Sequence, residues 1–327
     1  MDKKNQMDDN KKQDIMVTIK KIEIKDYFGK GNFEWNLDPV VNILGGKNGS
    51  GKSSLFKLCY ALLTNEKMNE TLDDGFKKIF KEAILTFSNG WTLIWSTKKA
   101  NVATLSLDGG KTSILRDVSV LKDEQGQQRK FSELQNLIRV YLINSFEQHV
   151  DKAILYGQQP NSIPLVDPTM LDLMIKDQID LRNKDFTQAM EDFMDASDEG
   201  DEARRLYEKN YKLIYASLNT FFQEYDKKIG SSFEFVKRGK KISYTHLSMG
   251  EKQILLLMLM VSNTQQKPCI FFMDEPDLSM HIDWKEILVK ELHELNPNMQ
   301  IILSTHAPSV ITGWHDRVKE VNQLIKK

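Results

Sequence analysis

The chain has 327 residues, and 45 Lys and Arg residues face 46 Asp and Glu residues, which leaves a formal net charge of −1. This length suits one large domain or one domain with an inserted lobe. The balanced charge excludes a global field that would attract nucleic acid or an acidic membrane surface. The longest apolar run, Ile254 to Val261, is too short to cross a membrane, because a spanning helix needs about 20 residues.

The cysteines and the N-terminal segment lead to two further general expectations. Cys59 and Cys269 both have apolar neighbours, which is typical of reduced thiols, so we expect a soluble cytoplasmic protein without a membrane partner. Residues 1–15 mix acidic and basic side chains without the apolar stretch of a secretory signal. They are predicted to form a disordered tail, and the domain is expected over residues 16–327.

The first elements form a strand, loop and helix unit. Apolar and polar residues alternate from 17 to 24, which predicts a half-buried strand with an irregularity at Lys20-Lys21. The β-branched run at 40–44 predicts a second strand. A glycine-rich loop follows it, and apolar residues at helical spacing after Lys52 predict a helix.

The pattern of apolar and polar residues changes twice in the middle of the chain. Residues 83–120 are predicted to form an antiparallel β lobe, since Asn89-Gly90 and Asp108-Gly109 separate alternating apolar runs as hairpin turns do. Residues 139–146 predict a buried strand. Residues 160–230 are expected to form an inserted helical lobe, which lacks the sustained heptads of a coiled coil.

The last third alternates helices with buried strands. A hairpin is predicted at 233–244 around Arg238-Gly239, followed by strands at 269–273 and 299–304 with a helix at 283–295 between them. Such alternation predicts a mostly parallel sheet, hence an α/β fold.

The segment "GKNGSGKS", Gly46 to Ser53, fits the phosphate-loop pattern G-x-x-x-x-G-K-[ST]. Its glycines let backbone N–H groups turn toward phosphate oxygens, and the following helix adds the positive end of its dipole. Lys52 is expected to reach the β- and γ-phosphates, and Ser53 to ligate Mg²⁺.

Polar residues end the two predicted strands of the last third. In "CIFFMDEPD", Asp274 can hold Mg²⁺ and Glu275 can polarise the water that attacks the γ-phosphate. His306 follows the next strand. Because ligands bind outside the carboxyl ends of parallel strands, His306 is expected to face the same site.

The loop "LSMGEKQ" offers a hydroxyl at Ser248 and free N–H groups near Gly250 at a helix start. The phosphate loop already supplies an anion cradle, so a second one needs another reason. Two copies that meet face to face would place this loop over the ATP bound by the partner, which predicts a homodimer held together by ATP.

These four motifs, in this order, resemble the head of an ABC-type ATPase: "GKNGSGKS", "LSMGEKQ", "FFMDEP" and "STHAP". The wording "LSxGE[KR]Q" and "MDEPDLSMH", with an embedded helical segment, looks like the SMC/RecF/OLD branch. The likeness is closest to OLD-like ATPases of bacterial anti-phage and DNA-repair systems. It implies an ABC-ATPase head with a mostly parallel sheet, an antiparallel β lobe and an inserted helical lobe.

The resemblance also implies site residues. Lys52, Glu275 and His306 would be catalytic, and Mg²⁺ would be held by Ser53, Asp274 and a Q-loop glutamine. Gln148 is the choice for that glutamine, with Gln158 and Gln159 as rivals, and Asp277 to His281 would form the D-loop. The residues that would contact ATP, from one copy or the other, are Gly46, Lys47, Asn48, Gly49, Ser50, Gly51, Lys52, Ser53, Ser54, Ser248, Gly250 and Glu251.

OLD proteins carry a TOPRIM nuclease after the ATPase, whereas 21 residues follow His306 here. The resemblance therefore implies an ATPase that forms a homodimer or a higher oligomer and regulates a separate effector, a nuclease, in anti-phage defence.

Three other functions stay open. A RecF-like or SMC-like DNA-repair ATPase would bind the duplex through basic segments at 236–241 and 98–99. A nucleotide-operated scaffold with little hydrolysis would dock a partner on the helical lobe at 170–230, which reads equally well as a covering layer on the sheet. A transporter subunit fits less well. Tyr27 and Phe28 are both plausible adenine-stacking residues by position.

Overall fold

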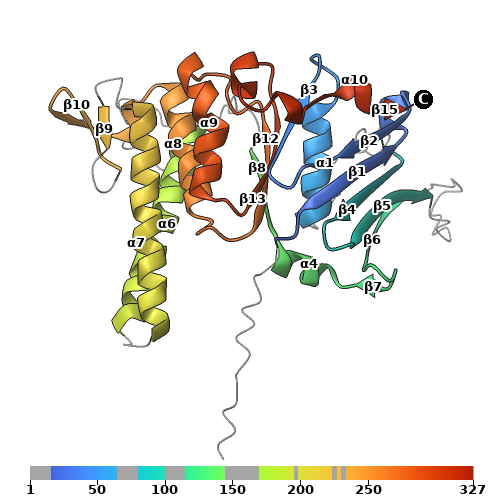
Figure 1. Ribbon diagram of the computed structural model, residues 1–327, viewed down its shortest axis with the longest axis horizontal. Helices are drawn as coiled ribbons and strands as arrows, with labels where there is room; N and C mark the ends of the chain where they lie inside the picture. The colour runs from blue at the N-terminus through green and yellow to red at the C-terminus, as the bar shows by residue number, and fades with distance from the viewer. Residues whose placement is uncertain are drawn as a thin grey trace, which may run out of the picture.

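The structure is a computed structural model. It describes residues 16–64, 80–99, 115–143, 169–194, 198–222, 227–229 and 233–326. The predicted tail at 1–15 and the predicted turn at Asp108-Gly109 lie outside these ranges. In the described part, two large sheets lie on either side of a central helix, and a layer of helices covers the far face of one of them (Figure 1).

The five-stranded sheet is wholly parallel, as the alternation of helices and strands predicted. Its strands, in spatial order, are β14 (Val318–Glu320), β3 (Val41–Gly45), β13 (Met299–Ser304), β12 (Cys269–Asp274) and β8 (Arg139–Ile143). Every residue of β12 and β13 is buried, because helices cover both faces. The predicted buried strand at 139–146 is corrected: β8 is an edge strand, and most of its residues are only half-buried.

The seven-stranded sheet pairs its neighbours antiparallel. Its order is β15 (Ile325–Lys326), β2 (Asn32–Asn36), β1 (Ile19–Lys25), β4 (Glu82–Phe87), β5 (Thr92–Lys99), β6 (Leu115–Lys122) and β7 (Gln128–Arg129). The antiparallel strands predicted at 83–120 are therefore part of a wider sheet that includes the N-terminal strand. The register shift between Ile19 and Lys21 matches the irregularity expected there.

Helix α1 (Lys52–Thr64) begins at the residue that the sequence predicted and lies between the two sheets (Figure 1). Its buried side chains join one apolar core with residues of both sheets; Phe56, for example, packs on Phe272 at a centroid distance of 5.6 Å. A short helix, α4 (Phe131–Leu137), leads into β8. This core fixes the start of α1 against both sheets.

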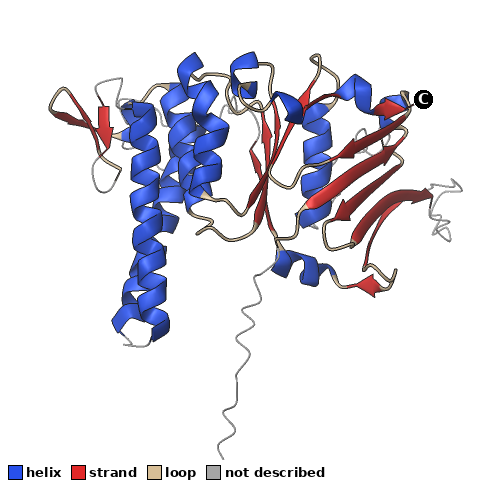
Figure 2. Ribbon diagram, viewed as in Figure 1, coloured by secondary structure: helices blue, strands red, loops and turns tan. Residues whose placement is uncertain are grey.

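The other face of the parallel sheet carries four helices, α6 (Met170–Met194), α7 (Asp198–Phe222), α8 (Met249–Ser262) and α9 (Ile282–Leu295). Helices α6 and α7 form the predicted insert as a long hairpin that extends beyond the sheet (Figures 1 and 2). Ile175 of α6 and Phe221 of α7 are fully buried in the core that also holds α8. This end of the insert is therefore a covering layer.

A small third sheet has the order β11 (Lys240–Ile242), β10 (Phe235–Lys237) and β9 (Lys227–Ile229). Arg238 and Gly239 form its turn with φ of 49° and 76°, which confirms the predicted hairpin. The remaining short elements are η1 (Tyr27–Gly29), η3 (Tyr244–His246), η4 (Pro308–Ile311), η5 (His315–Arg317) and α10 (Val321–Leu324).

Two expectations from composition can be compared with the described residues. None of the helices described there is long and apolar enough to cross a membrane. Both cysteines are free and buried, and burial raises the pKa of the Cys269 thiol to about 12. The thiols are therefore neutral at ordinary pH and poor nucleophiles.

Candidate nucleotide site

The site residues follow three neighbouring parallel strands. The register places Leu44 of β3, Ser304 of β13 and Asp274 of β12 in one row. The phosphate loop, His306 and Glu275 come directly after these positions. They therefore meet at the carboxyl edge of the sheet, where open α/β folds bind ligands.

The phosphate loop has the backbone conformation that its glycines permit. Gly49 and Gly51 have φ of 72° and 97°, a left-handed region that other residues rarely adopt. A Cβ on Gly51 would lie 2.3 Å from Cε2 of Phe28, so a side chain there would collide. The Ser50 hydroxyl oxygen is buried and has no hydrogen-bond partner among the described residues. An orphaned polar atom inside a glycine-built loop fits a phosphate cradle.

Lys52, His306 and Glu275 form one cluster. Lys52 is a residue that is only 5 % exposed; its ammonium donates to the Gly46 carbonyl at 2.9 Å and lies 3.0 Å from Nε2 of His306. The same Nε2 lies 3.2 Å from Oε1 of Glu275. The structure thus brings together the three residues that the sequence named as catalytic.

The backbone at Glu275 is held in an unusual conformation. Its φ is 49°, and its N–H donates to the Ser304 carbonyl at 3.0 Å. The Ser304 hydroxyl donates to Oδ1 of Asp274 at 2.6 Å. A left-handed non-glycine residue costs about 1–3 kcal/mol and persists where its surroundings impose it, often at functional sites. Ser304 therefore holds the carboxylate of Asp274 and the backbone of Glu275, a role that the sequence did not indicate.

Asp277, at the start of the predicted D-loop, is buried in a polar network. It accepts a hydrogen bond from the Thr305 hydroxyl at 2.8 Å and pairs with Lys285 at 3.1 Å. Asp277 thereby ties the segment after β12 to the segment that carries His306. The participation of Lys285 could not be found from motifs, because it lies on the covering helix α9.

The loop "LSMGEKQ", residues 247–253, is called the signature loop below, and it begins α8 with a capping box. Ser248 Oγ accepts from the Glu251 N–H at 3.4 Å, and the Ser248 N–H donates to Glu251 Oε2 at 2.8 Å. Within one chain the Glu251 carboxylate thus caps its own helix. Ser248 is exposed, whereas the eight apolar residues after Gln253 are buried except for half-buried Met260. The exposed Ser248 is therefore held in place by a helix that is packed into the core.

Gly250 has a structural reason to be glycine. A Cβ there would lie 2.3 Å from the carbonyl oxygen of Ser279. The sequence pointed to free N–H groups near this glycine, and the structure adds a close approach of the helix to the D-loop backbone. The signature helix and the D-loop therefore form one packed unit.

The helices that follow the phosphate loop and the signature loop lie on opposite faces of the parallel sheet. Helix α1, behind the phosphate loop, packs with Phe272 and Ile302, whereas α8 packs with Phe271 and Ile301. Successive residues of a strand point to opposite faces. This arrangement fits the expectation that the signature loop acts on a nucleotide bound elsewhere.

The adenine-stacking candidates separate in the structure. Tyr27 is fully buried, and its hydroxyl donates to the Ser50 carbonyl at 3.2 Å, so it supports the phosphate loop and is excluded as a stacking residue. Phe28 is half-buried beside Gly51 and remains a candidate.

The remaining residues predicted to contact ATP or Mg²⁺ are less buried or lie outside the described ranges. Lys47, Asn48, Gly49 and Ser53 are exposed, and Ser54 is half-buried. Gln148 and its rivals Gln158 and Gln159 lie outside the described residues. Within the described ranges, no group of three or more His, Cys, Asp or Glu side chains could hold a metal by itself. A Mg²⁺ ion held by Ser53, Asp274 and phosphate oxygens needs no such group.

In its fold and in the order of its motifs, the chain resembles an ABC-type, SMC-like ATPase head. Residues 158–312 match the family described as "AAA domain, putative AbiEii toxin, Type IV TA system". The chain is 31% identical over 140 residues to "Retron Vc95 probable ATPase" of Vibrio cholerae serotype O1 biovar El Tor, a match that covers 38% of this chain. The chain spans about a quarter of the length of that relative, 27%.

Two solved structures share the fold. One is an Smc head domain with an extended coiled coil bound to the C-terminal domain of ScpA, from Pyrococcus furiosus, with a TM-score of 0.51 and 14% identity over 90% of this chain and 91% of that chain. The other is an SmcHead bound to the C-winged helix domain of ScpA, with a TM-score of 0.50, 14% identity and the same coverage. At this identity the likeness concerns the fold alone.

Proposed function

We propose that the chain binds ATP with Mg²⁺ at the carboxyl edge of its parallel sheet and hydrolyses it to ADP and phosphate. The observation that carries this proposal is the cluster of Lys52, His306 and Glu275 beside the phosphate loop. The histidine lies 3.0 Å from a buried lysine and 3.2 Å from a carboxylate, and these are the groups that phosphoryl transfer to water requires.

Each residue of the cluster has a separate task. The Lys52 ammonium neutralises phosphate oxygens that enter the cradle. Glu275 orients the attacking water and accepts its proton. When its Nε2 carries a proton, His306 can donate a hydrogen bond to the γ-phosphate or to Glu275. Asp274 and Ser53 would hold Mg²⁺, which supplies charge stabilisation to the transferred phosphoryl group.

We also propose that two copies close on ATP, with Ser248 of each acting on the nucleotide of the other. The opposite placement of α1 and α8 and the exposed Ser248 support this assembly. The name of the Vibrio cholerae relative, a retron ATPase, supports a role in anti-phage defence beside a separate effector, for which a nuclease is the expected kind. A cytoplasmic location follows from that role.

Hydrolysis is tested by Glu275→Gln. This variant keeps the shape of the side chain but removes its basicity, so we expect unchanged ATP binding and a steady-state hydrolysis rate at least about 100-fold lower. Binding is measured with a fluorescent ATP analogue, and turnover by phosphate release. Lys52→Ala serves as the matched variant, which should lose binding as well.

Hydrolysis by Glu275→Gln at the wild-type rate would contradict the assignment of Glu275. Loss of ATP binding in that variant would show that Glu275 supports the cradle and has no separate role in the chemical step.

A DNA-repair ATPase is the second candidate, because the turn of the β10–β11 hairpin is exposed and basic, with Lys237, Arg238, Lys240 and Lys241. Phosphate contacts through this turn would make duplex binding fall steeply with salt, with a slope of log K against log salt near −0.9 per contact. Changing Lys237 and Lys240 to Gln should reduce that slope by about two units. Absence of duplex binding by the wild-type chain at low salt would exclude this candidate.

A further inference from the structure

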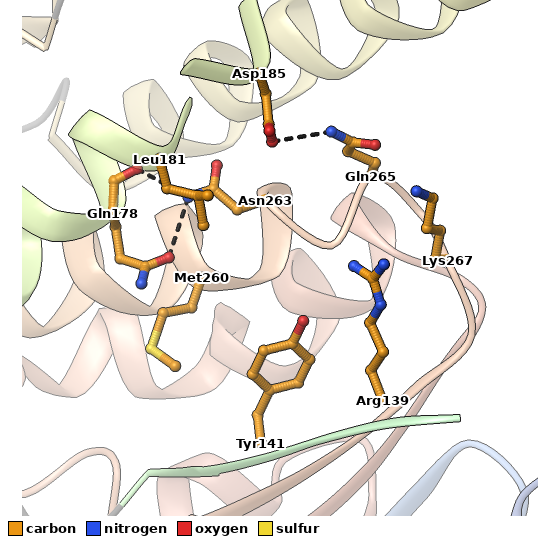
Figure 3. A pocket seen from close by; sticks show the side chains of 9 residues that line it. All are labelled: Arg139, Tyr141, Gln178, Leu181, Asp185, Met260, Asn263, Gln265 and Lys267. Atoms are coloured by element: carbon orange, nitrogen blue, oxygen red, sulfur yellow. Dashed lines mark hydrogen bonds between the residues drawn. The ribbon is translucent and has the colours of Figure 1, made fainter. Parts of the chain in front are cut away.

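A pocket of about 340 Å³ lies at the opposite end of the parallel sheet from the nucleotide site. Its walls come from the start of β8, from α6, from the last turn of α8 and from the loop that leads to β12. Figure 3 shows Arg139 and Tyr141 rising from β8 toward side chains of α6 and α8. Its volume is at the lower end of the range of small-molecule sites, about 300–1,000 Å³.

The pocket carries an excess of positive charge. Arg139 and Lys267 line it from two different elements, against one carboxylate, Asp185. Asp185 accepts a hydrogen bond from Gln265 at 2.9 Å. Neither Arg139 nor Lys267 forms an ion pair with a carboxylate in the part of the chain that the structure describes. Two cationic side chains thus line the same pocket, and neither pairs with a described carboxylate. This arrangement fits an anionic ligand.

The side chain of Asn263, which lines the same pocket, is fixed by Gln178. Both amide hydrogens of Asn263 are directed at Gln178, with Nδ2 2.9 Å from its carbonyl and 3.0 Å from Oε1. The Asn263 Oδ1 atom is buried and has no hydrogen-bond partner among the described residues. Because this atom is closed to solvent, it offers no contact to a ligand in the pocket, and the two cations indicate the ligand class, an anionic group.

The remaining wall is apolar and aromatic. Tyr141 is half-buried, and one face of its ring stacks on Phe271 at a centroid distance of 4.5 Å. Met260 and the exposed Leu181 line the pocket beside it. Flat apolar surface next to amide side chains is the environment that proteins use to contact a nucleobase.

The loop on one side of the pocket is strained and firmly held. Gln265 and Gln266 have φ of 54° and 57°, two consecutive left-handed residues other than glycine. The fully buried Asn296 fixes this loop through the Thr264 hydroxyl at 2.8 Å and the Lys267 carbonyl at 3.0 Å. A strained conformation that the surroundings impose is typical of binding sites and keeps the pocket preformed.

We propose that this pocket binds a single nucleotide, with its phosphate at Arg139 and Lys267 and its base against the ring of Tyr141. The nucleotide can be free or can be the end of a nucleic-acid strand, because both present the same chemistry. The site is separate from the ATP site: Lys267 precedes β12 and Asp274 ends it, a separation of at least about 17 Å along the strand at 3.3 Å per residue.

The test is calorimetric titration of the full chain with nucleoside monophosphates and with a 5′-phosphorylated single-stranded oligonucleotide. The double variant Arg139→Gln/Lys267→Gln should weaken binding at least about tenfold, while Lys290→Gln, which removes an exposed lysine on α9, should not change it. Binding of monophosphates identifies a free nucleotide as the ligand. Binding of the oligonucleotide alone identifies a strand end, and both results support the site.

Two further measurements separate this site from the proposed ATPase. Lys52→Ala should keep monophosphate or oligonucleotide binding, and the double variant should keep ATP binding. Ribose 5-phosphate, which lacks a base, should bind at least about tenfold more weakly than the nucleotides. Equal binding of ribose 5-phosphate, unchanged binding in the double variant, or no binding of any probe at millimolar concentration would overturn the proposal.

Discussion

The Nε2 atom of His306 has two neighbours and can satisfy only one of them at a time. Without a proton it accepts from Lys52 at 3.0 Å, and with a proton it donates to Glu275 at 3.2 Å. ATP that enters the cradle would draw Lys52 toward its phosphates. His306 would then be released from Lys52, so that phosphate binding is linked to the environment of Glu275.

At the residue scale, Gly250 gives the clearest stability prediction. Gly250→Ala would place a Cβ 2.3 Å from the Ser279 carbonyl oxygen, and both backbones would have to move. Such overpacking costs about 1–3 kcal/mol, despite the better helix propensity of alanine. Denaturant unfolding measures the loss. Met249→Ala, at the exposed neighbouring position, should change the free energy of unfolding by less than about 0.5 kcal/mol.

An unfolding midpoint of Gly250→Ala equal to that of the wild type would show that the contact between the signature helix and the D-loop relaxes freely. The proposed packed unit would then be wrong.

Residue types and spacing were enough to name Lys52, Asp274, Glu275 and His306, because each follows directly after a predicted strand or loop. Tyr27 and Ser304 could not be assigned in this way. The support that Tyr27 gives to the phosphate loop depends on the packing of η1 against Gly51. The role of Ser304 depends on the register between β12 and β13.

At the element scale, α6 and α8 run in parallel and are joined by polar contacts along their length. Lys252 pairs with Asp172 at 2.7 Å, Arg182 donates to Ser262 at 2.8 Å, and Gln265 donates to Asp185 at 2.9 Å. The insert is therefore attached to both ends of the signature helix.

The pair of Lys252 and Asp172 is buried, with side-chain exposures of 8% and 5%. Lys252→Met should destabilise the fold by about 3–5 kcal/mol, because it leaves a buried carboxylate without its partner. Adding Asp172→Asn removes that charge and keeps an acceptor for the Thr169 N–H. Thermal and denaturant unfolding should therefore show the double variant to be more stable than Lys252→Met alone.

If the two substitutions are simply additive, the ion pair does not contribute to attaching the insert. The sequence indicated the two helices through their periodicity, yet it could not indicate this pair, because 80 residues separate its two members along the chain, as they do Arg182 and Ser262.

At the scale of the whole molecule, the parallel sheet was predictable and the antiparallel sheet only in part. Fully apolar runs such as 269–273 are typical of strands covered on both faces. The pairing of β1 with β4, by contrast, joins a strand that precedes α1 in the chain to a strand that follows it. Local hairpin signals predicted β4 and β5, but this non-local pairing depends on how both sheets close over α1.

If two copies assemble around ATP, the mass of the protein in solution must change when ATP is added. Sedimentation velocity of Glu275→Gln should show a monomer without nucleotide and a dimer with ATP and Mg²⁺. Adding Ser248→Arg should abolish the dimer while ATP binding, measured separately, persists, because the bulky cation would occupy the surface that meets the partner's nucleotide. A monomer of Glu275→Gln at saturating ATP, or a normal ATP-induced dimer of the double variant, would contradict the account.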